Sequence, residues 1–168
     1  MATPGLLSRR LLPAACFLYL LAPVSGQDRI TELHTQFERE NEPVRKAKAL
    51  TKLGDAQFEL LRKETDTGEY TEARRTIQDY RDEVRSTLGA LKASGVDAER
   101  KPGGFKQLQI HLRKSLRELD QTILTLPADQ REPFETIRTE LAGMEKELID
   151  LLFPRQPGKT PEKDKKKS

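Results

Sequence analysis

Apolar residues recur at alternating steps of three and four along almost the whole of residues 27–153. This spacing places them on one face of an α-helix, and the charged and polar residues between them suit a face in water. No segment alternates with the period of two that a β-strand needs. The pattern predicts an all-α domain with four apolar stripes: Ile30, Leu33, Phe37, Val44, Ala47, Leu50, Leu53, Leu60 and Leu61; Tyr70, Ala73, Ile77, Tyr80, Val84, Leu88 and Leu91; Phe105, Leu108, Leu112, Leu116, Leu119, Ile123 and Leu126; and Phe134, Ile137, Leu141, Met144, Leu148 and Leu151.

The stripes are separated by residues that end helices. Thr65-Asp66-Thr67-Gly68 closes the first stripe, with Gly68 suited to the left-handed backbone conformation. Residues 94–97 and 101–104 delimit a second loop, and residues 126–129 form a third, where Asp129 and Glu132 resemble a capping box. Pro43 interrupts the first stripe, so we expect a kink or short break near Asn41-Glu42, with Pro43 opening the next helical segment.

Long helices joined by short loops pack most simply as an up-and-down bundle. The sequence therefore predicts an antiparallel up-and-down helical bundle of about four long helices, the first of them kinked or broken near Pro43. A long coiled coil and the self-association of two hairpins are competing arrangements. Gly54 and Gly89 are expected to be buried where two helices approach closely. The centre of the core is predicted at Leu112, Leu119, Leu141 and Leu148.

A short motif recurs 35 residues apart. Leu53-Gly54 is followed by Gly68-Glu69-Tyr70 and Ala73, and Leu88-Gly89 is followed at the same spacing by Gly103-Gly104-Phe105 and Leu108. The first copy resembles part of the tetratricopeptide repeat, whose helix hairpin carries Leu-Gly early and Gly-x-Tyr-x-x-Ala at the turn into its second helix. The resemblance covers only about 20 residues, and the spacing from Leu53 to Gly68 is about twice that of the family. It implies a peptide-binding helical repeat as an alternative architecture.

Residues 1–26 have the pattern of a cleavable signal peptide. Arg9-Arg10 precede an apolar run, and Val24-Ser25-Gly26 places small residues before Gln27, where we expect the mature chain to begin. Cys16 is the only cysteine, so the mature chain would hold no disulfide. A lipoprotein site at Ala14-Ala15-Cys16 is the alternative. We expect an exported protein, either secreted or periplasmic.

Charge is distributed unevenly along the chain. The formal net charge is +3, and residues 154–168 carry six basic residues against Glu162 and Asp164, whereas residues 27–153 are nearly balanced. The balanced body does not have the dominant basic face of a nucleic-acid-binding domain. We expect residues 154–168, with Pro154, Pro157 and Pro161, to form a disordered basic tail. Weak contact of this tail with an anionic surface is its candidate role.

Candidate chemistry is sparse. His34 and His111 are the only histidines, and neither has a second histidine or a glutamate at the spacing of a metal site. Both adjoin apolar positions, so we expect partly exposed histidines on helix faces. Gly103-Gly104 lacks the pattern of a phosphate-binding loop. We predict no catalytic, cofactor-binding or metal-ligating residues and no cofactor.

These features predict an exported, non-enzymatic helical protein that acts by protein–protein interaction, as an adaptor, scaffold or chaperone-like component, with an unidentified protein partner. One alternative is an enzyme or ligand carrier whose site assembles between helices, with Tyr70, Tyr80, His111 and inter-helix carboxylates as contributors. The other is a peptide-binding repeat resembling the tetratricopeptide family. Grooves between stacked hairpins would distinguish that repeat from a closed bundle.

Overall fold

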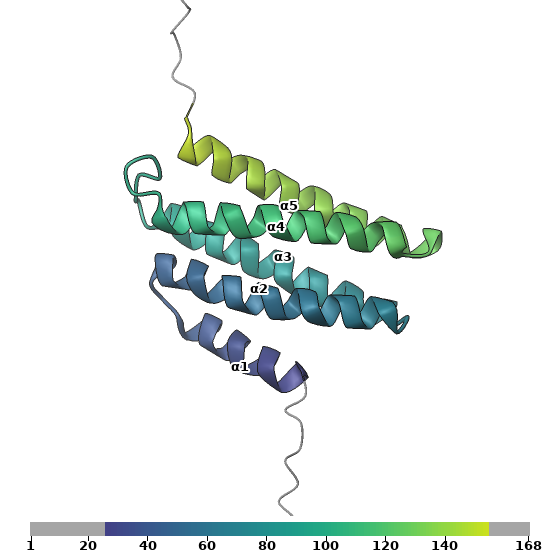
Figure 1. Cartoon of the computed structure of the whole chain (residues 1–168). Helices are drawn as coiled ribbons and strands as arrows, with labels where there is room; N and C mark the ends of the chain where they lie inside the picture. Colours follow the sequence, from purple (N-terminus) through teal and green to yellow (C-terminus); the bar gives the residue numbers. More distant parts are fainter. Residues whose placement is uncertain (1–25, 155–168) are drawn as a thin grey trace, which may run out of the picture.

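The structure, a computed structural model, describes residues 26–154 and, from Asp28 on, their side chains. This part of the chain is all-helical and has no strand, which confirms that the fold is all-α. Its helices pack against one another (Figure 1). Apart from Gly26 and Pro154, the predicted leader and basic tail lie outside the described residues. The elements are α1 (Gly26–Arg39), α2 (Pro43–Asp66), α3 (Tyr70–Ala93), α4 (Gly103–Thr125), the 3₁₀ turn η1 (Ala128–Gln130) and α5 (Arg131–Leu152).

The first apolar stripe is divided between two helices, so five α-helices occur where about four were expected. Pro43 occupies the first turn of α2, where its missing N–H costs no hydrogen bond. The carboxylate of Glu42 caps this helix by accepting hydrogen bonds from the backbone N–H groups of Val44 and Arg45, at 3.0 and 2.7 Å. Capping therefore starts α2 at Pro43, after α1 has ended at Arg39.

The helices pair as two hairpins laid side by side. α2 packs on α3, and α4 packs on α5. Between the hairpins, α2 packs on α4 and α3 packs on α5. In both of these pairs the helices run in the same direction (Figure 1). Ion pairs follow this parallel register: they join Asp55 to Lys114 and Arg62 to Glu118 across α2 and α4, and Arg85 to Glu140 and Lys92 to Glu147 across α3 and α5.

This pairing differs from that of an up-and-down ring. In such a ring each helix lies antiparallel to both neighbours, and the first helix packs on the last. Here α2 and α4 form one layer and α3 and α5 a second, while α2 and α5 share no interface of comparable extent. α1 packs along α2 and reaches α3 through His34. The described helices are therefore stacked in two layers.

The predicted apolar stripes form one continuous core. Leu112, Leu119, Leu141 and Leu148 are completely buried, as predicted. Two stripe residues lie outside this core: Val44, in the first turn of α2, is 43% exposed, and Leu60 is only partly buried. Within residues 26–154, no helix combines the length and the apolar character needed to cross a lipid bilayer.

Two local predictions were wrong. Asp129 does not cap α5, because it lies in η1. Helix α5 begins at Arg131 without a side-chain cap. The Arg131 guanidinium instead donates a hydrogen bond to the carbonyl of Leu126 at 2.9 Å. Gly89 is exposed, with nothing near the position of a Cβ. Gly104 allows the close approach expected of Gly89, because a Cβ there would meet Leu91 Cδ2 at 2.7 Å. Gly68 does adopt the predicted left-handed conformation, with φ of +78°.

Candidate functional site

A groove follows the seam between the parallel helices α2 and α4. Its first part is a surface cavity of about 410 Å³, lined by Thr51, Asp55, Gly103, Lys106, Gln107, Ile110, His111 and Lys114. A second depression of about 270 Å³ continues along the same two helices toward their C-terminal ends and is lined by Phe58, Arg62, Thr65, Asp66, Glu118, Gln121, Thr122 and Thr125. We call the two together the α2/α4 groove.

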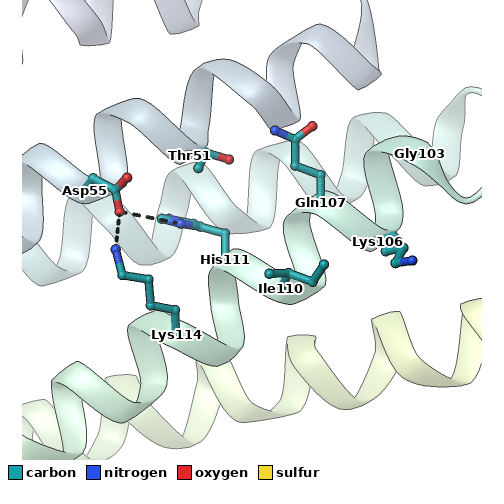
Figure 2. A pocket seen from close by; sticks show the side chains of 8 residues that line it. All are labelled: Thr51, Asp55, Gly103, Lys106, Gln107, Ile110, His111 and Lys114. Carbon is teal, nitrogen blue, oxygen red and sulfur yellow. Dashed lines mark hydrogen bonds and ion pairs between the residues drawn. The ribbon is translucent and has the colours of Figure 1, made fainter.

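Helical spacing accounts for the residues that line the first cavity. Thr51 and Asp55 are one turn apart on α2, and Gln107, Ile110 and Lys114 follow one another at steps of three and four on α4. Because α2 and α4 run in the same direction, these two rows lie side by side along the seam. Figure 2 shows the side chains of His111 and Lys114 both extending from α4 toward Asp55 of α2.

Ile110 gives the groove an exposed apolar side chain. It is 57% exposed, although most other large apolar residues of α4 are buried. Lys106 lies one turn before Ile110 in the lining, and Lys48 precedes Thr51 by one turn on α2. Among the described residues, neither lysine has an acidic side chain within ion-pair distance. The groove therefore combines an apolar contact with the unpaired positive charge of Lys106.

An ion-pair ladder separates the two parts of the groove. Lys114 Nζ lies 2.8 Å from Asp55 Oδ1 and 3.6 Å from Glu118 Oε1, and Glu118 also pairs with Arg62 at 3.7 Å. The hydrogen bond to Asp55 raises the pKa of the Lys114 ammonium. All four side chains are at least partly exposed, so we expect these pairs to set the register of the helices more than to stabilise the fold.

His111 is buried, which corrects the expectation of a partly exposed histidine. It is only 4% exposed, and its Nε2 has no hydrogen-bond partner. Its Nδ1 lies 4.0 Å from Asp55 Oδ1, too far for a hydrogen bond. Burial lowers the pKa of the imidazole, and the nearby Asp55 only partly opposes this effect. The neutral form of His111 is therefore favoured. The expectation holds for His34, whose side chain is half exposed.

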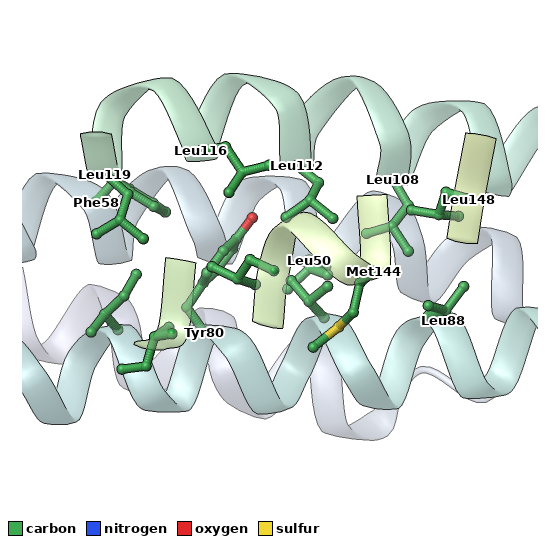
Figure 3. Packing of buried hydrophobic residues seen from close by; sticks show 14 of the residues in the cluster. Leu50, Phe58, Tyr80, Leu88, Leu108, Leu112, Leu116, Leu119, Met144 and Leu148 are labelled. Carbon is green, nitrogen blue, oxygen red and sulfur yellow. The ribbon is translucent and has the colours of Figure 1, made fainter. Parts of the chain in front are cut away.

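Tyr80 lies behind the groove, in the core between the helices. Its ring is fully buried, it contacts the rings of Phe58 and His111 edge-on, and its O–H donates to Ser115 Oγ at 2.9 Å. Figure 3 shows its hydroxyl pointing toward α4, near Leu112 and Leu116. Burial raises the pKa of the phenol well above its usual value. Tyr80 therefore stays neutral and acts as a packing residue with a satisfied hydroxyl.

The residues suggested for an enzyme or carrier site are only partly brought together. Tyr80 and His111 meet, with ring centroids 5.9 Å apart, whereas Tyr70 opens α3 ten positions before Tyr80. His111 Nε2 faces the backbone at Gly54, and the Tyr80 hydroxyl is bonded to Ser115. Residues 28–154 contain no group of three His, Asp or Glu side chains placed to hold a metal ion.

The sequence alone did not single out Asp55, Ile110, Lys114 or Ser115. Each lies beside an apolar stripe, where an isolated isoleucine or a charged residue is common. One signal was present: Ile110 falls outside the three-and-four spacing of its own stripe. Its exposure could have been predicted from that position.

None of the protein families, curated proteins or solved structures compared with the chain matches it.

Proposed function

We propose that this chain is an exported, non-enzymatic binding protein and that the α2/α4 groove holds an acidic segment of a partner protein with one apolar anchor residue. The exposure of Ile110 in a cavity of about 410 Å³ is the observation that carries this proposal. Binding sites are concave, with an apolar lining and a few polar groups, and the cavity around Ile110 has this form.

The charge of the groove defines the partner. Lys106 lines the cavity together with Ile110 and has no acidic partner among the described residues, whereas Lys114 is already paired with Asp55. A segment with a carboxylate next to an apolar residue would neutralise Lys106 and cover Ile110. Such complementary charges contribute mainly to specificity and to the rate of association.

The proposed architecture for this role is a stack of two long hairpins, α2–α3 and α4–α5, with α1 added along α2. This architecture shares long antiparallel hairpins with the predicted bundle of about four helices, and it shares the stacking of hairpins with the peptide-binding repeat. Its support is the groove between equivalent helices of successive hairpins, since repeat proteins bind extended segments on such surfaces. An adaptor, scaffold or chaperone-like protein needs a surface that holds a partner, and the α2/α4 groove would provide one. Export remains part of the proposal, and mass spectrometry of the exported chain should find Gln27 at its N-terminus.

An enzyme or ligand-carrier role receives less support from the same groove. It would need the titratable atoms of His111 and Tyr80 at the cavity surface. The Tyr80 hydroxyl instead faces the interior and donates to Ser115. His111 is only 4% exposed, and its Nε2 lies against Gly54, so that only Nδ1, 4.0 Å from Asp55, is on the cavity side.

The proposal can be tested by selecting binders from a library of random peptides displayed on phage, with the full chain as the target. We expect enrichment of peptides that place a large apolar residue next to Asp or Glu. A synthetic peptide of the enriched sequence should bind Ile110→Asp at least about tenfold more weakly than the wild type, since a buried apolar anchor contributes more than 1 kcal/mol. Lys106→Glu should also weaken binding.

Leu124→Asp provides the matched control. Leu124 lies on the same helix and is 75% exposed, but it lines neither part of the groove. This variant should bind the peptide as the wild type does. Equal binding by the wild type and Ile110→Asp, or no enrichment at all, would contradict the proposal.

A further inference from the structure

A second cavity, of about 220 Å³, lies between α1 and α3, away from the α2/α4 groove. Its lining includes His34, Phe37 and Glu38 from α1 and Asp79, Asp82 and Glu83 from α3. Four of these six residues are acidic. Asp82 is already paired with Arg81 and Arg85, at 2.9 and 3.0 Å. Among the described residues, Glu38 and Asp79 have no basic side chain within ion-pair distance.

Glu83 is the innermost acid of this cavity. It is only 6% exposed, and neither of its carboxyl oxygens has a hydrogen-bond partner. The closest cationic group, Nε2 of His34, lies 3.6 Å from Oε1 and is charged only when protonated. Burial raises the pKa of Glu83 to about 7, and the charges of Asp79, Glu38 and Asp82 add to the rise, which the nearby Gln57 side chain partly opposes. A buried carboxylate without a partner is costly unless a ligand satisfies it.

The chemistry of the cavity selects an organic cation. The described residues hold no three donors placed around one point, as a metal ion would require. The one ammonium of α2 near this site, Nζ of Lys46, lies 4.3 Å from the Phe37 ring and makes no ion pair with the four acids. Acidic side chains that no ammonium group pairs with suit a cation on an alkyl chain, whose head donates hydrogen bonds to a carboxylate while its stem extends toward the surface.

We propose that the α1/α3 cavity binds a primary ammonium group presented by a lysine side chain of a partner protein. The ammonium would pair with the carboxylate of Glu83, and the negative charges of Glu38 and Asp79 would lie around it. This site is independent of the α2/α4 groove, because the two cavities share no lining residue.

The test is a titration of the full chain with n-butylammonium chloride at constant ionic strength, followed by NMR through the backbone amides of α1 and α3. Glu83→Gln should weaken binding at least about tenfold, since it removes the charge that the ammonium pairs with. Glu135→Gln removes the same charge from an exposed position on α5 and should bind as the wild type does. Equal weakening by both variants would overturn the proposal, as would calcium chloride binding at this cavity more tightly than the ammonium.

The response to pH is a second readout. Only the ionised Glu83 pairs with the ammonium, so affinity should fall about tenfold between pH 8 and pH 6. The groups that face Glu83 are His34 and Glu38 of α1, Gln57 of α2, and Asp79 and Asp82 of its own helix. The fall should persist in His34→Gln, because it depends on the charge of Glu83. Affinity that does not change with pH would overturn the role of Glu83.

Two further variants test whether ammonium binding depends on the groove or on the C-terminal lysines. Ile110→Asp should leave ammonium binding unchanged, so that failure of the groove proposal and failure of this one can be distinguished. Replacing Lys163, Lys165, Lys166 and Lys167 by Gln in the full chain should also leave it unchanged. Tighter ammonium binding after that replacement would assign the cavity to the lysines of this chain itself and overturn the assignment to a partner.

Discussion

Gly54 of α2 faces the imidazole of His111 of α4 across the seam between the two layered hairpins. A Cβ at Gly54 would lie 2.4 Å from His111 Nε2 and 2.8 Å from Cε2 of Tyr80. Both distances are well below any normal contact between atoms. The absent side chain of Gly54 is therefore what lets two parallel helices and a buried histidine share this part of the core.

Gly54→Ala should destabilise the fold by about 1–3 kcal/mol, as expected for overpacking of a filled core. Chemical denaturation followed by circular dichroism measures the loss. Gly89→Ala is the matched control, because Gly89 also lies within a helix but has open space around it. That change should stabilise the chain by about 0.5–1 kcal/mol through helix propensity alone. If both variants gain stability, the seam does not need a glycine at position 54.

The hydrogen bond from Tyr80 to Ser115 should be measurable through a double-mutant cycle. Tyr80→Phe leaves the buried Ser115 hydroxyl without its donor, and Ser115→Ala leaves the buried Tyr80 hydroxyl without its acceptor. Each variant should therefore cost about 1–3 kcal/mol of unfolding free energy. The double variant should cost less than the sum, because no unsatisfied group remains. Strictly additive losses would mean that the two hydroxyls are not coupled.

Truncation of the central leucines tests the core itself. Leu112→Ala and Leu141→Ala remove completely buried side chains and should each cost about 2–5 kcal/mol of unfolding free energy. Leu124→Ala changes the same residue type at a position that is 75% exposed and should alter stability by less than about 0.5 kcal/mol. A small effect at Leu112 or Leu141 would place these residues outside the core in solution.

Stability should depend on pH through Glu83. Its pKa in the folded protein, about 7, lies above the ordinary value of a glutamic acid, so the folded state binds the proton more tightly than the unfolded state does. Between the ordinary glutamate pKa and pH 7, the contribution of Glu83 to the free energy of unfolding therefore falls as the pH rises. Above pH 7 the full cost of burying its charge is present. His111 acts in the opposite sense, because its lowered pKa favours the unfolded state as the pH falls through the ordinary range of histidine.

Glu83→Gln isolates the first effect. The variant should be more stable than the wild type at pH 8, by an amount on the order of 1–3 kcal/mol, and the difference should shrink toward pH 5. Unfolding curves of the two proteins across this range measure the difference, in which the contribution of His111 cancels. A difference that stays constant with pH would contradict a buried, unpartnered carboxylate at this position.

The sequence by itself determined the helices and the apolar faces. The spacing of residues such as Leu108, Leu112 and Leu119 depends only on the helical period, and Gly68 ends a helix because of its own backbone freedom. These are local properties, set by residues within a few positions of one another. The all-α class and the buried leucines were predictable for that reason, and the capping box at Asp129 was not, because a 3₁₀ turn competes for the same residues.

Only the tertiary structure decided which helices are neighbours and in which direction they run. An apolar stripe packs against any other stripe, so periodicity does not distinguish a ring from two stacked hairpins. That choice depends on contacts between distant residues: Gly104 beside Val44, and Gly54 beside His111 and Tyr80. The contact at Gly54 buries His111, whereas the packing of α1 against α3 encloses Glu83. The candidate sites therefore depend on which helices pair, and this pairing cannot be predicted from any single segment of the sequence.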